Sequence, residues 1–358
     1  MKKLIKPVAL KKGDSVATIS LSWGGASIFK KRYEQGKQQF ENAFGVKIVE
    51  TSHALSSADD LYNHPQWRLN DLMEALEDKS IKGILCNIGG DDTIRLLPYM
   101  TDKHFQTIYD NPKIFLGMSD TTINHLMFFK AGVGSFYSPC TLFGYAENGG
   151  IDNFMIENTK KTIFDSSPIG LLPESKNHIL ERVDWGNDNI VRTRTLSSPW
   201  RYIQGSKTVR GRLIGGCFDS LMLCVNGTSL FPPLEEFEDA VLFLENSEDK
   251  PSPVMMSYFL RTLGIMGILE RIKGILFARP GGEFLPQDET EKIRWVNMYT
   301  EFDETFIRIC KEFNREDLPI VTNMDFGHTV PQLIFPYGAM VEINPINRTV
   351  AILESAVK

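Results

Sequence analysis

Two spacings of apolar residues alternate along the first part of the chain. Short continuous apolar runs are separated by segments in which apolar residues recur three or four positions apart, as in 29–44, which Gly45 ends. Continuous runs are typical of strands buried on both faces, and the wider spacing is typical of amphipathic helices. The alternation predicts an α/β fold whose first sheet is parallel, with helices on both faces. The expected strands lie at 16–19, 46–49, 83–88 and 114–116.

Loops rich in small residues follow three of these strands, at 20–25, 89–92 and 117–120. The carboxyl ends of parallel strands share one edge of the sheet, where ligands of such folds bind, so the three loops should lie together. Gly89 and Gly90 lack the G-x-G-x-x-G spacing of a dinucleotide-binding loop. NAD is therefore not expected, and we expect no other cofactor.

Ser119 lies in the tight turn expected between the apolar run at 114–116 and a helix that begins near Thr121. Such a turn exposes a side chain at the sheet edge and points the first free N–H groups of the helix toward it. A serine nucleophile needs both features, an exposed hydroxyl and donors for a developing oxyanion. The alternative, that Ser119 or Asp120 is only a helix N-cap, is the commoner role and stays open at this point.

The rest of the pattern predicts a second domain. Turn signals interrupt every periodicity from Gly144 to about Lys207, and we interpret this stretch as a linker with loops and a short hairpin that carries Trp185 and Trp200. Regular structure then returns with a run that Gly215 and Gly216 should break as a tight turn, a charged helix near 287–313 and a closing hairpin. The expected division is an N-terminal domain at 1–164, a linker at 165–207 and a C-terminal domain at 208–358.

Composition narrows the classes of function. The chain has 358 residues, of which 42% are hydrophobic and 23% charged, and a net charge of −6. These values are ordinary for a globular protein and give no reason to expect nucleic acid or an anionic membrane as a partner. The cysteines lie far apart, without the spacing of a zinc site or a disulfide framework, so we expect no metal. No apolar run approaches the roughly 20 residues of a membrane span and no signal peptide is recognisable, so we expect a cytoplasmic protein.

Two residues at the ends of later apolar runs have the chemistry to assist a serine nucleophile, which needs a base and a group that orients the base. His328 follows an apolar run, in a turn that Gly327 and Pro331 shape, and Glu245 ends the run at 241–245. A histidine or carboxylate in such a position is more often structural, so neither residue alone carries an assignment.

Several short motifs, taken together, stand in the order and at about the spacing of one known family, from residue 13 to 345. These motifs are Gly89-Gly-Asp-Asp, Phe115-Leu-Gly-Met-Ser-Asp, Gly215-Gly, Leu242-Phe-Leu-Glu-Asn, Ala278-Arg-Pro-Gly-Gly-Glu and Asp325-Phe-Gly-His-Thr. On them the chain resembles the LD-carboxypeptidase family of serine peptidases, which includes the microcin C immunity peptidases. The long middle segment is more similar to that immunity branch than to the murein carboxypeptidases.

The resemblance implies a Rossmann-like N-terminal domain, a smaller C-terminal α/β domain and an active site between them. It implies that Ser119 is the nucleophile, His328 the general base and Glu245 the carboxylate that orients the imidazole. The backbone N–H groups of Gly90 and Asp120 would form the oxyanion hole. Members of the family tend to form homodimers, which we also expect here.

The same resemblance suggests substrate contacts. The expected substrate-binding residues are Gly89, Asp91, Trp185, Trp200, Arg279 and Glu283. In the immunity branch, aromatic side chains of the middle segment stack on an adenine, and Trp185 and Trp200 are the candidates, unless they only pin the segment to the core. Arg279 is suited to a free carboxylate and Glu283 to an amino group. Cys217 stands where many members have asparagine, which bears on substrate preference rather than on the chemistry.

The function expected from the resemblance is hydrolysis of an amide bond in a peptidyl- or aminoacyl-nucleotide of the microcin C type, through an acyl-enzyme. One alternative is an L,D-carboxypeptidase that removes the terminal D-Ala of a murein tetrapeptide, and another is a catalytically silent ligand-binding protein. A third, a nucleotide- or sugar-binding Rossmann protein in which Ser119 caps a helix, requires Glu245 and His328 to lie far from Ser119. An aromatic platform near Ser119 would favour the nucleotide, and a cationic pocket would favour the murein peptide.

Overall fold

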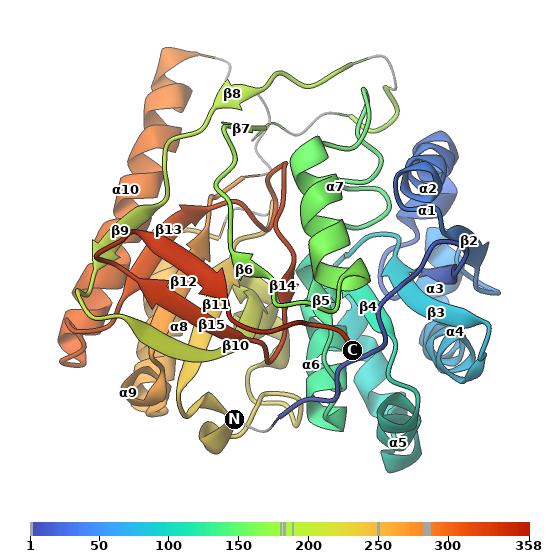
Figure 1. Cartoon of the computed structure of the whole chain (residues 1–358), viewed down its shortest axis with the longest axis horizontal. Coiled ribbons are helices and arrows are strands. Elements are labelled where there is room, and N and C mark those ends of the chain that lie inside the picture. The colour runs from blue at the N-terminus through green and yellow to red at the C-terminus, as the bar shows by residue number, and fades with distance from the viewer. Residues whose placement is uncertain (1–2, 180, 182–183, 188–189, 249–250, 282–287) are drawn as a thin grey trace.

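Two sheets form the frame of the molecule, one in each half of the chain (Figure 1). The computed structural model describes residues 3–179, 181, 184–187, 190–248, 251–281 and 288–358. In the first sheet the strand order is β14-β5-β4-β3-β1-β2, and the neighbours among β1 to β5 are parallel, as predicted. Its strands are β1 (Ser15–Ile19), β2 (Lys47–Glu50), β3 (Ile81–Cys86), β4 (Ile114–Gly117), β5 (Phe136–Tyr137) and β14 (Phe335–Pro336).

Helical segments alternate with these strands along the chain, and particular residues set their ends. Gly45 ends α2 in the left-handed conformation (φ 68°), the side chain of Ser57 caps α3, and Pro65 occupies the first turn of α4. The helices are α1 (Gly25–Ile28), α2 (Lys30–Phe44), α3 (Ala58–Asn63), α4 (Pro65–Glu77), α5 (Asp102–Asp110) and α6 (Thr122–Ala131), with 3₁₀ turns η1 (Thr93–Tyr99) and η2 (Ser119–Thr121).

The second sheet has the order β6-β16-β15-β10-β11-β12-β13-β9, with β10 to β13 parallel. Its strands are β6 (Gly170–Leu171), β9 (Arg201–Gln204), β10 (Val209–Cys217), β11 (Ala240–Glu245), β12 (Gly274–Ala278), β13 (Ile320–Met324), β15 (Met340–Asn344) and β16 (Thr349–Ile352). The expected closing hairpin is β15 and β16. The accompanying helices are η4 (Ser220–Val225), η5 (Leu234–Phe237), α8 (Pro253–Ile265), α9 (Ile268–Arg271) and α10 (Glu289–Glu312).

The predicted glycine turn after residue 214 is wrong. Gly215 and Gly216 continue β10, with φ 154° and 132°. A Cβ on Gly215 would overlap the backbone carbonyl of Phe243 in the neighbouring β11. The glycines therefore allow two strands to approach closely rather than reversing the chain.

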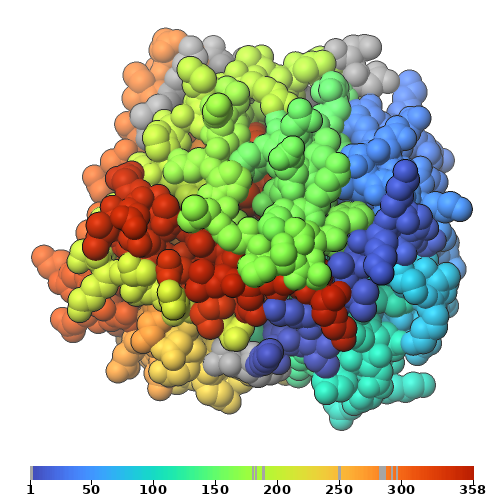
Figure 2. Space-filling model, in the orientation of Figure 1, coloured from blue at the N-terminus to red at the C-terminus, as the bar shows by residue number. Residues whose placement is uncertain are grey.

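The middle segment does more than connect the two halves. It begins after α7 (Asn153–Thr159) and the π-turn η3 (Lys160–Phe164), and it supplies both edge strands of the second sheet, β6 and β9. The expected pairing within it is the antiparallel pair β7 (Asn177–His178) and β8 (Thr195–Leu196). On the face in Figure 2, the green part of the chain covers the boundary between the blue N-terminal half and the orange-red C-terminal half.

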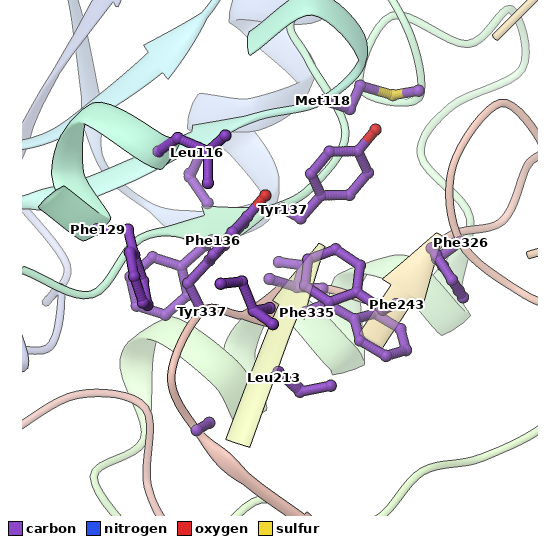
Figure 3. Packing of buried hydrophobic residues seen from close by; sticks show 14 of the residues in the cluster. Leu116, Met118, Phe129, Phe136, Tyr137, Leu213, Phe243, Phe326, Phe335 and Tyr337 are labelled. Carbon is purple, nitrogen blue, oxygen red and sulfur yellow. The ribbon is translucent and has the colours of Figure 1, made fainter. Parts of the chain in front are cut away.

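One apolar core cluster extends through both sheets. Aromatic side chains from the two sheets meet there, with the rings of Tyr137 (β5) and Phe243 (β11) 5.6 Å apart (Figure 3). Strand β14, from the C-terminal half, also pairs with β5 of the first sheet. The shared core and this strand pair fix the position of one half relative to the other. A site built from residues of both halves requires such a fixed position. Among the described helices, none combines the length and the apolar character that crossing a bilayer requires.

Candidate active site

Ser119 occupies a strained turn between β4 and α6. Its φ is 61°, a left-handed conformation that costs a residue with a Cβ roughly 1–2 kcal/mol. The N-cap of η2 is Met118 and that of α6 is Thr121, and neither helix start has a side-chain cap. The cap interpretation of Ser119 and Asp120 therefore fails, because the turn holds the serine without using it as a cap.

The three loops at the carboxyl ends of the strands meet around this turn, as the strand pattern predicts. The carboxylate of Asp120 accepts hydrogen bonds from Ser22 Oγ (2.7 Å) and from the backbone N–H of Thr93 (2.8 Å). A Cβ on Gly89 would lie 2.9 Å from Ser119 Cβ and 3.1 Å from the backbone nitrogen of Asp120. Glycine at this position keeps open the space beside the serine and the amide that follows it.

His328 lies in the turn after β13 and meets Glu245 from the end of β11. Its Nδ1 is 2.7 Å from Glu245 Oε2, and Glu245 is fully buried. Gly327 (φ 80°) makes this approach possible, since a Cβ there would lie 2.6 Å from the same carboxylate oxygen. A second carboxylate, that of Glu248, lies 2.9 Å from the other ring nitrogen, Nε2.

These surroundings control the charge of the imidazole. Burial by itself would lower the pKa of His328, but the charges of Glu245 and Glu248 outweigh it and raise the pKa well above its usual value. The other fully buried histidine near the serine behaves oppositely. Burial lowers the pKa of His125 to about 4, and its ring contacts Gly117 O and Ser135 Oγ. Near the serine, His328 thus has the environment of a base paired to a carboxylate, and His125 does not.

A cavity of about 80 Å³ connects the residues from the two halves. It is lined by Trp23, Ile88, Gly89, Gly90, Met118, Ser119, Phe143, Glu181, Trp185, Arg192, Glu248 and His328. The rings of Trp23 and Trp185 lie 6.4 Å apart, and the guanidinium of Arg32 lies 5.1 Å from the Trp185 ring. Among the described residues, no group of three His, Cys, Asp or Glu side chains is arranged to hold a metal ion.

Arg192 already has an ion-pair partner within the protein, which it shares with Arg32. Its guanidinium lies 2.7 Å from Glu147, which also pairs with Arg32 at 3.3 Å. Arg192 additionally donates to the backbone oxygen of Glu181 (2.6 Å). The aromatic rings are therefore the more prominent feature of the lining, because the guanidinium of Arg192 is already engaged by Glu147 and by a backbone oxygen.

The structure does not bring Trp200 and Arg279 to this cavity. Trp200 is 2% exposed and its indole N–H donates to Asp325 Oδ2 (2.8 Å), while Arg279 pairs with the other oxygen of Asp325 (2.8 Å). Both side chains instead fix the start of the turn that carries His328, because Asp325 is the residue they share. Asp91 is solvent-exposed beside Gly90, and Glu283 lies outside the described residues.

Several lining residues escaped the sequence analysis. Trp23 had a usable signal, since it lies in the small-residue loop after the first strand. Glu248 follows Glu245 by three positions, but nothing in its local pattern marks it. Glu181 and Arg192 come from the irregular middle segment, whose folding over the cavity no periodicity indicates.

Two family models match the two halves of the chain. The model of the LD-carboxypeptidase N-terminal domain matches residues 16–138, and that of the LD-carboxypeptidase C-terminal domain matches 210–343. The chain belongs to the LD-carboxypeptidase family. The LD-carboxypeptidases are serine peptidases, so this protein is a hydrolase of that kind, and its two-domain α/β architecture is that of solved family members.

Named relatives cover nearly the whole length of the chain. The microcin C7 self-immunity protein MccF of Escherichia coli is 26% identical over 98% of this chain and 96% of its own. A probable murein peptide carboxypeptidase of Bacillus subtilis is 24% identical over 96% and 95%. The crystal structure of an MccF-like protein from Streptococcus pneumoniae, in complex with AMP, aligns with a TM-score of 0.81 at 30% identity, over 95% of this chain and 98% of that one.

Proposed function

We propose that this serine peptidase hydrolyses the amide bond of an aminoacyl- or peptidyl-nucleotide, with Ser119, His328 and Glu245 as its triad. The observation that carries the proposal is that Ser119 and His328 line one cavity with Trp23 and Trp185. Base–aromatic stacking suits a nucleotide leaving group, whereas a free carboxylate would need an unpaired cation. The solved MccF-like relative in complex with AMP supports the same substrate class.

In the proposed reaction Ser119 Oγ attacks the acyl carbon while Nε2 of neutral His328 accepts its proton. Glu245 holds Nδ1–H and stabilises the imidazolium that forms. The N–H groups of Asp120 and Gly90 stabilise the oxyanion, in the space that Gly89 leaves open. The imidazolium then protonates the leaving nitrogen. Water activated by His328 finally hydrolyses the acyl-enzyme and frees the serine.

The contact between Glu248 and Nε2 predicts a pH dependence. The base must lose a proton before it accepts one from Ser119, so kcat/KM should rise with pH through the raised pKa of His328. Glu248→Gln removes one of the two carboxylates that hold this proton, so the acid limb of the profile should move to lower pH. A pH series of kcat/KM measures the shift. The exposed Glu235→Gln serves as the control, and an unmoved limb in Glu248→Gln would refute the role of this contact.

The substrate class is tested by offering two compounds to the purified enzyme. One is an aminoacyl-sulfamoyl adenosine, from which hydrolysis releases the free amino acid, and the other is a murein tetrapeptide ending in D-Ala. Mass spectrometry of the products should show amino acid release from the adenosine compound. Release of D-Ala alone would replace the proposal with the murein carboxypeptidase function. Turnover of neither compound would reject both.

Trp185 should act through binding rather than through the chemistry. Alanine substitution of a stacking aromatic costs about 1–3 kcal/mol per base, so Trp185→Ala should raise KM for the adenosine substrate about 10- to 100-fold with little change in kcat. Trp67→Ala is the matched control, because that ring stacks on His53 and His64 and is not part of the cavity lining. Equal KM values in the two variants would show that Trp185 does not contact the base.

We further propose that the enzyme is a homodimer and acts in the cytoplasm. Support for the dimer comes from α8, where Val254, Tyr258 and Ile265 share one face and are 57%, 60% and 84% exposed. The cysteines, all free thiols, are compatible with a reducing compartment. Light scattering on the purified chain should give twice the monomer mass.

A further inference from the structure

Tyr137 links two parts of the triad that come from different halves of the chain. Its hydroxyl accepts a hydrogen bond from the backbone N–H of Ser119 (2.9 Å) and donates one to Glu245 Oε1. Glu245 therefore has a partner on each oxygen, Tyr137 on Oε1 and His328 on Oε2. Tyr137 is 1% exposed, so water does not substitute for either bond.

We propose that Tyr137 is a positioning residue that holds the turn of Ser119 and the carboxylate of Glu245 in one fixed geometry. This inference rests on the proposed triad. The bond to Ser119 N supports the left-handed turn, because a buried amide without an acceptor would favour a different backbone conformation. The bond to Oε1 fixes the plane of the carboxylate, so that its other oxygen faces the imidazole.

A second buried tyrosine, Tyr337, serves as a control that distinguishes this positioning role from packing alone. Tyr337 is 3% exposed and packs on the same Phe243 ring, at 5.2 Å against 5.6 Å for Tyr137. Its hydroxyl donates to the backbone oxygen of Gly215 and not to the triad. Loss of the Tyr337 hydroxyl should therefore reproduce the packing and desolvation effects of a Tyr137 variant without its effect on the chemistry.

The charged groups around Tyr137 predict the direction in which the pH profile moves when its hydroxyl is removed. Glu245 and the thiol of Cys217 face it from the second sheet, and Glu248 reaches the triad through His328. His125 is the ring beside it on α6 (5.7 Å) and is neutral above its lowered pKa of about 4. Removing the Tyr137 hydroxyl leaves more negative charge on the Glu245 oxygens, which then hold the imidazole proton more strongly. The acid limb should consequently move to higher pH.

The experiment compares Tyr137→Phe with Tyr337→Phe in two assays, hydrolysis of the aminoacyl-sulfamoyl adenosine and the rate of Ser119 labelling by a fluorophosphonate. We expect Tyr137→Phe to lower kcat and the labelling rate about 10- to 100-fold, with KM nearly unchanged. Both pH profiles should move to higher pH. Tyr337→Phe should keep the wild-type profile, and melting curves of both variants show whether folding is affected.

An isosteric change keeps the test valid if Tyr137→Phe does not fold. Placing 3-fluorotyrosine at position 137 retains the hydroxyl and makes it a stronger donor, so the acid limb should move to lower pH. The inference would be overturned if Tyr137→Phe had the labelling rate and pH profile of Tyr337→Phe, or if the 3-fluorotyrosine enzyme had those of the unmodified enzyme. Because labelling needs no substrate, an enzyme that labels normally but hydrolyses neither compound would reject the proposed function alone.

Discussion

Ser119→Ala should eliminate turnover of the aminoacyl-sulfamoyl adenosine, with a loss in kcat of about 10⁴- to 10⁶-fold. The reason is chemical rather than structural, because the side chain is not a helix cap and its hydroxyl supports no fold element. The turn is held instead by the hydrogen bonds that the Asp120 carboxylate accepts and by the one that the backbone N–H of Ser119 donates to the Tyr137 hydroxyl. The variant should fold normally, and alanine tolerates the left-handed backbone about as poorly as serine does.

Binding and covalent labelling distinguish this expectation from loss of structure. Calorimetry should show that Ser119→Ala still binds the adenosine compound, since the aromatic lining is unchanged. Intact mass after exposure to a fluorophosphonate should increase for the wild type and for Ser257→Ala, a buried serine on α8, and should stay constant for Ser119→Ala. A Ser119→Ala enzyme that retains normal turnover would mean that another group performs the attack.

Sequence reasoning placed Ser119 in a tight turn between a strand and a helix because that signal is local. An apolar run, a glycine and a helically spaced segment within a few residues of Ser119 define a strand, a turn and a helix, and the structure contains all three. The alternation of strands and helices likewise predicts that three loops lie at one edge of the sheet. The roles proposed for His328 and Glu245 came from the ordered motifs of a family. Nothing in the sequence around His328 distinguishes a general base from a structural histidine, and nothing around Glu245 distinguishes an orienting carboxylate from a structural one.

What the sequence could not predict depends on contacts between distant segments. Trp185 and Trp200 have the same kind of neighbourhood in the chain, yet one lines the cavity and the other is buried against Asp325. A glycine pair in a sequence indicates only that the backbone cannot accommodate a Cβ, and it is compatible with a turn or with a close approach of two strands. At Gly215 the reason is the close approach of β11 rather than the predicted turn. Glu248 became visible only once the fold placed it against His328.

Glu245→Gln should lower kcat by about 10⁴-fold while leaving the shape of the site intact. The glutamine fills the same volume, but its amide is neutral and no longer stabilises the imidazolium, 2.7 Å from Nδ1 in the wild type. If the amide NH₂ faces the ring, Nδ1 becomes the acceptor and Nε2 carries the proton, so the base has the wrong tautomer for attack. With one of the two facing carboxylates gone, the pKa of His328 falls and the remaining activity should extend to lower pH.

Glu342→Gln is the matched control, because that glutamate also belongs to a strand but pairs with Arg210 at the surface, 2.7 Å away. Surface pairs of this kind contribute about 0–1 kcal/mol, so its rate and melting temperature should remain near those of the wild type. A loss below about 10-fold in Glu245→Gln would be inconsistent with an orienting carboxylate, since removing its charge is expected to cost far more. A large loss without the shift of the profile to lower pH would instead indicate a displaced His328, because only an imidazole still in place responds to the missing charge.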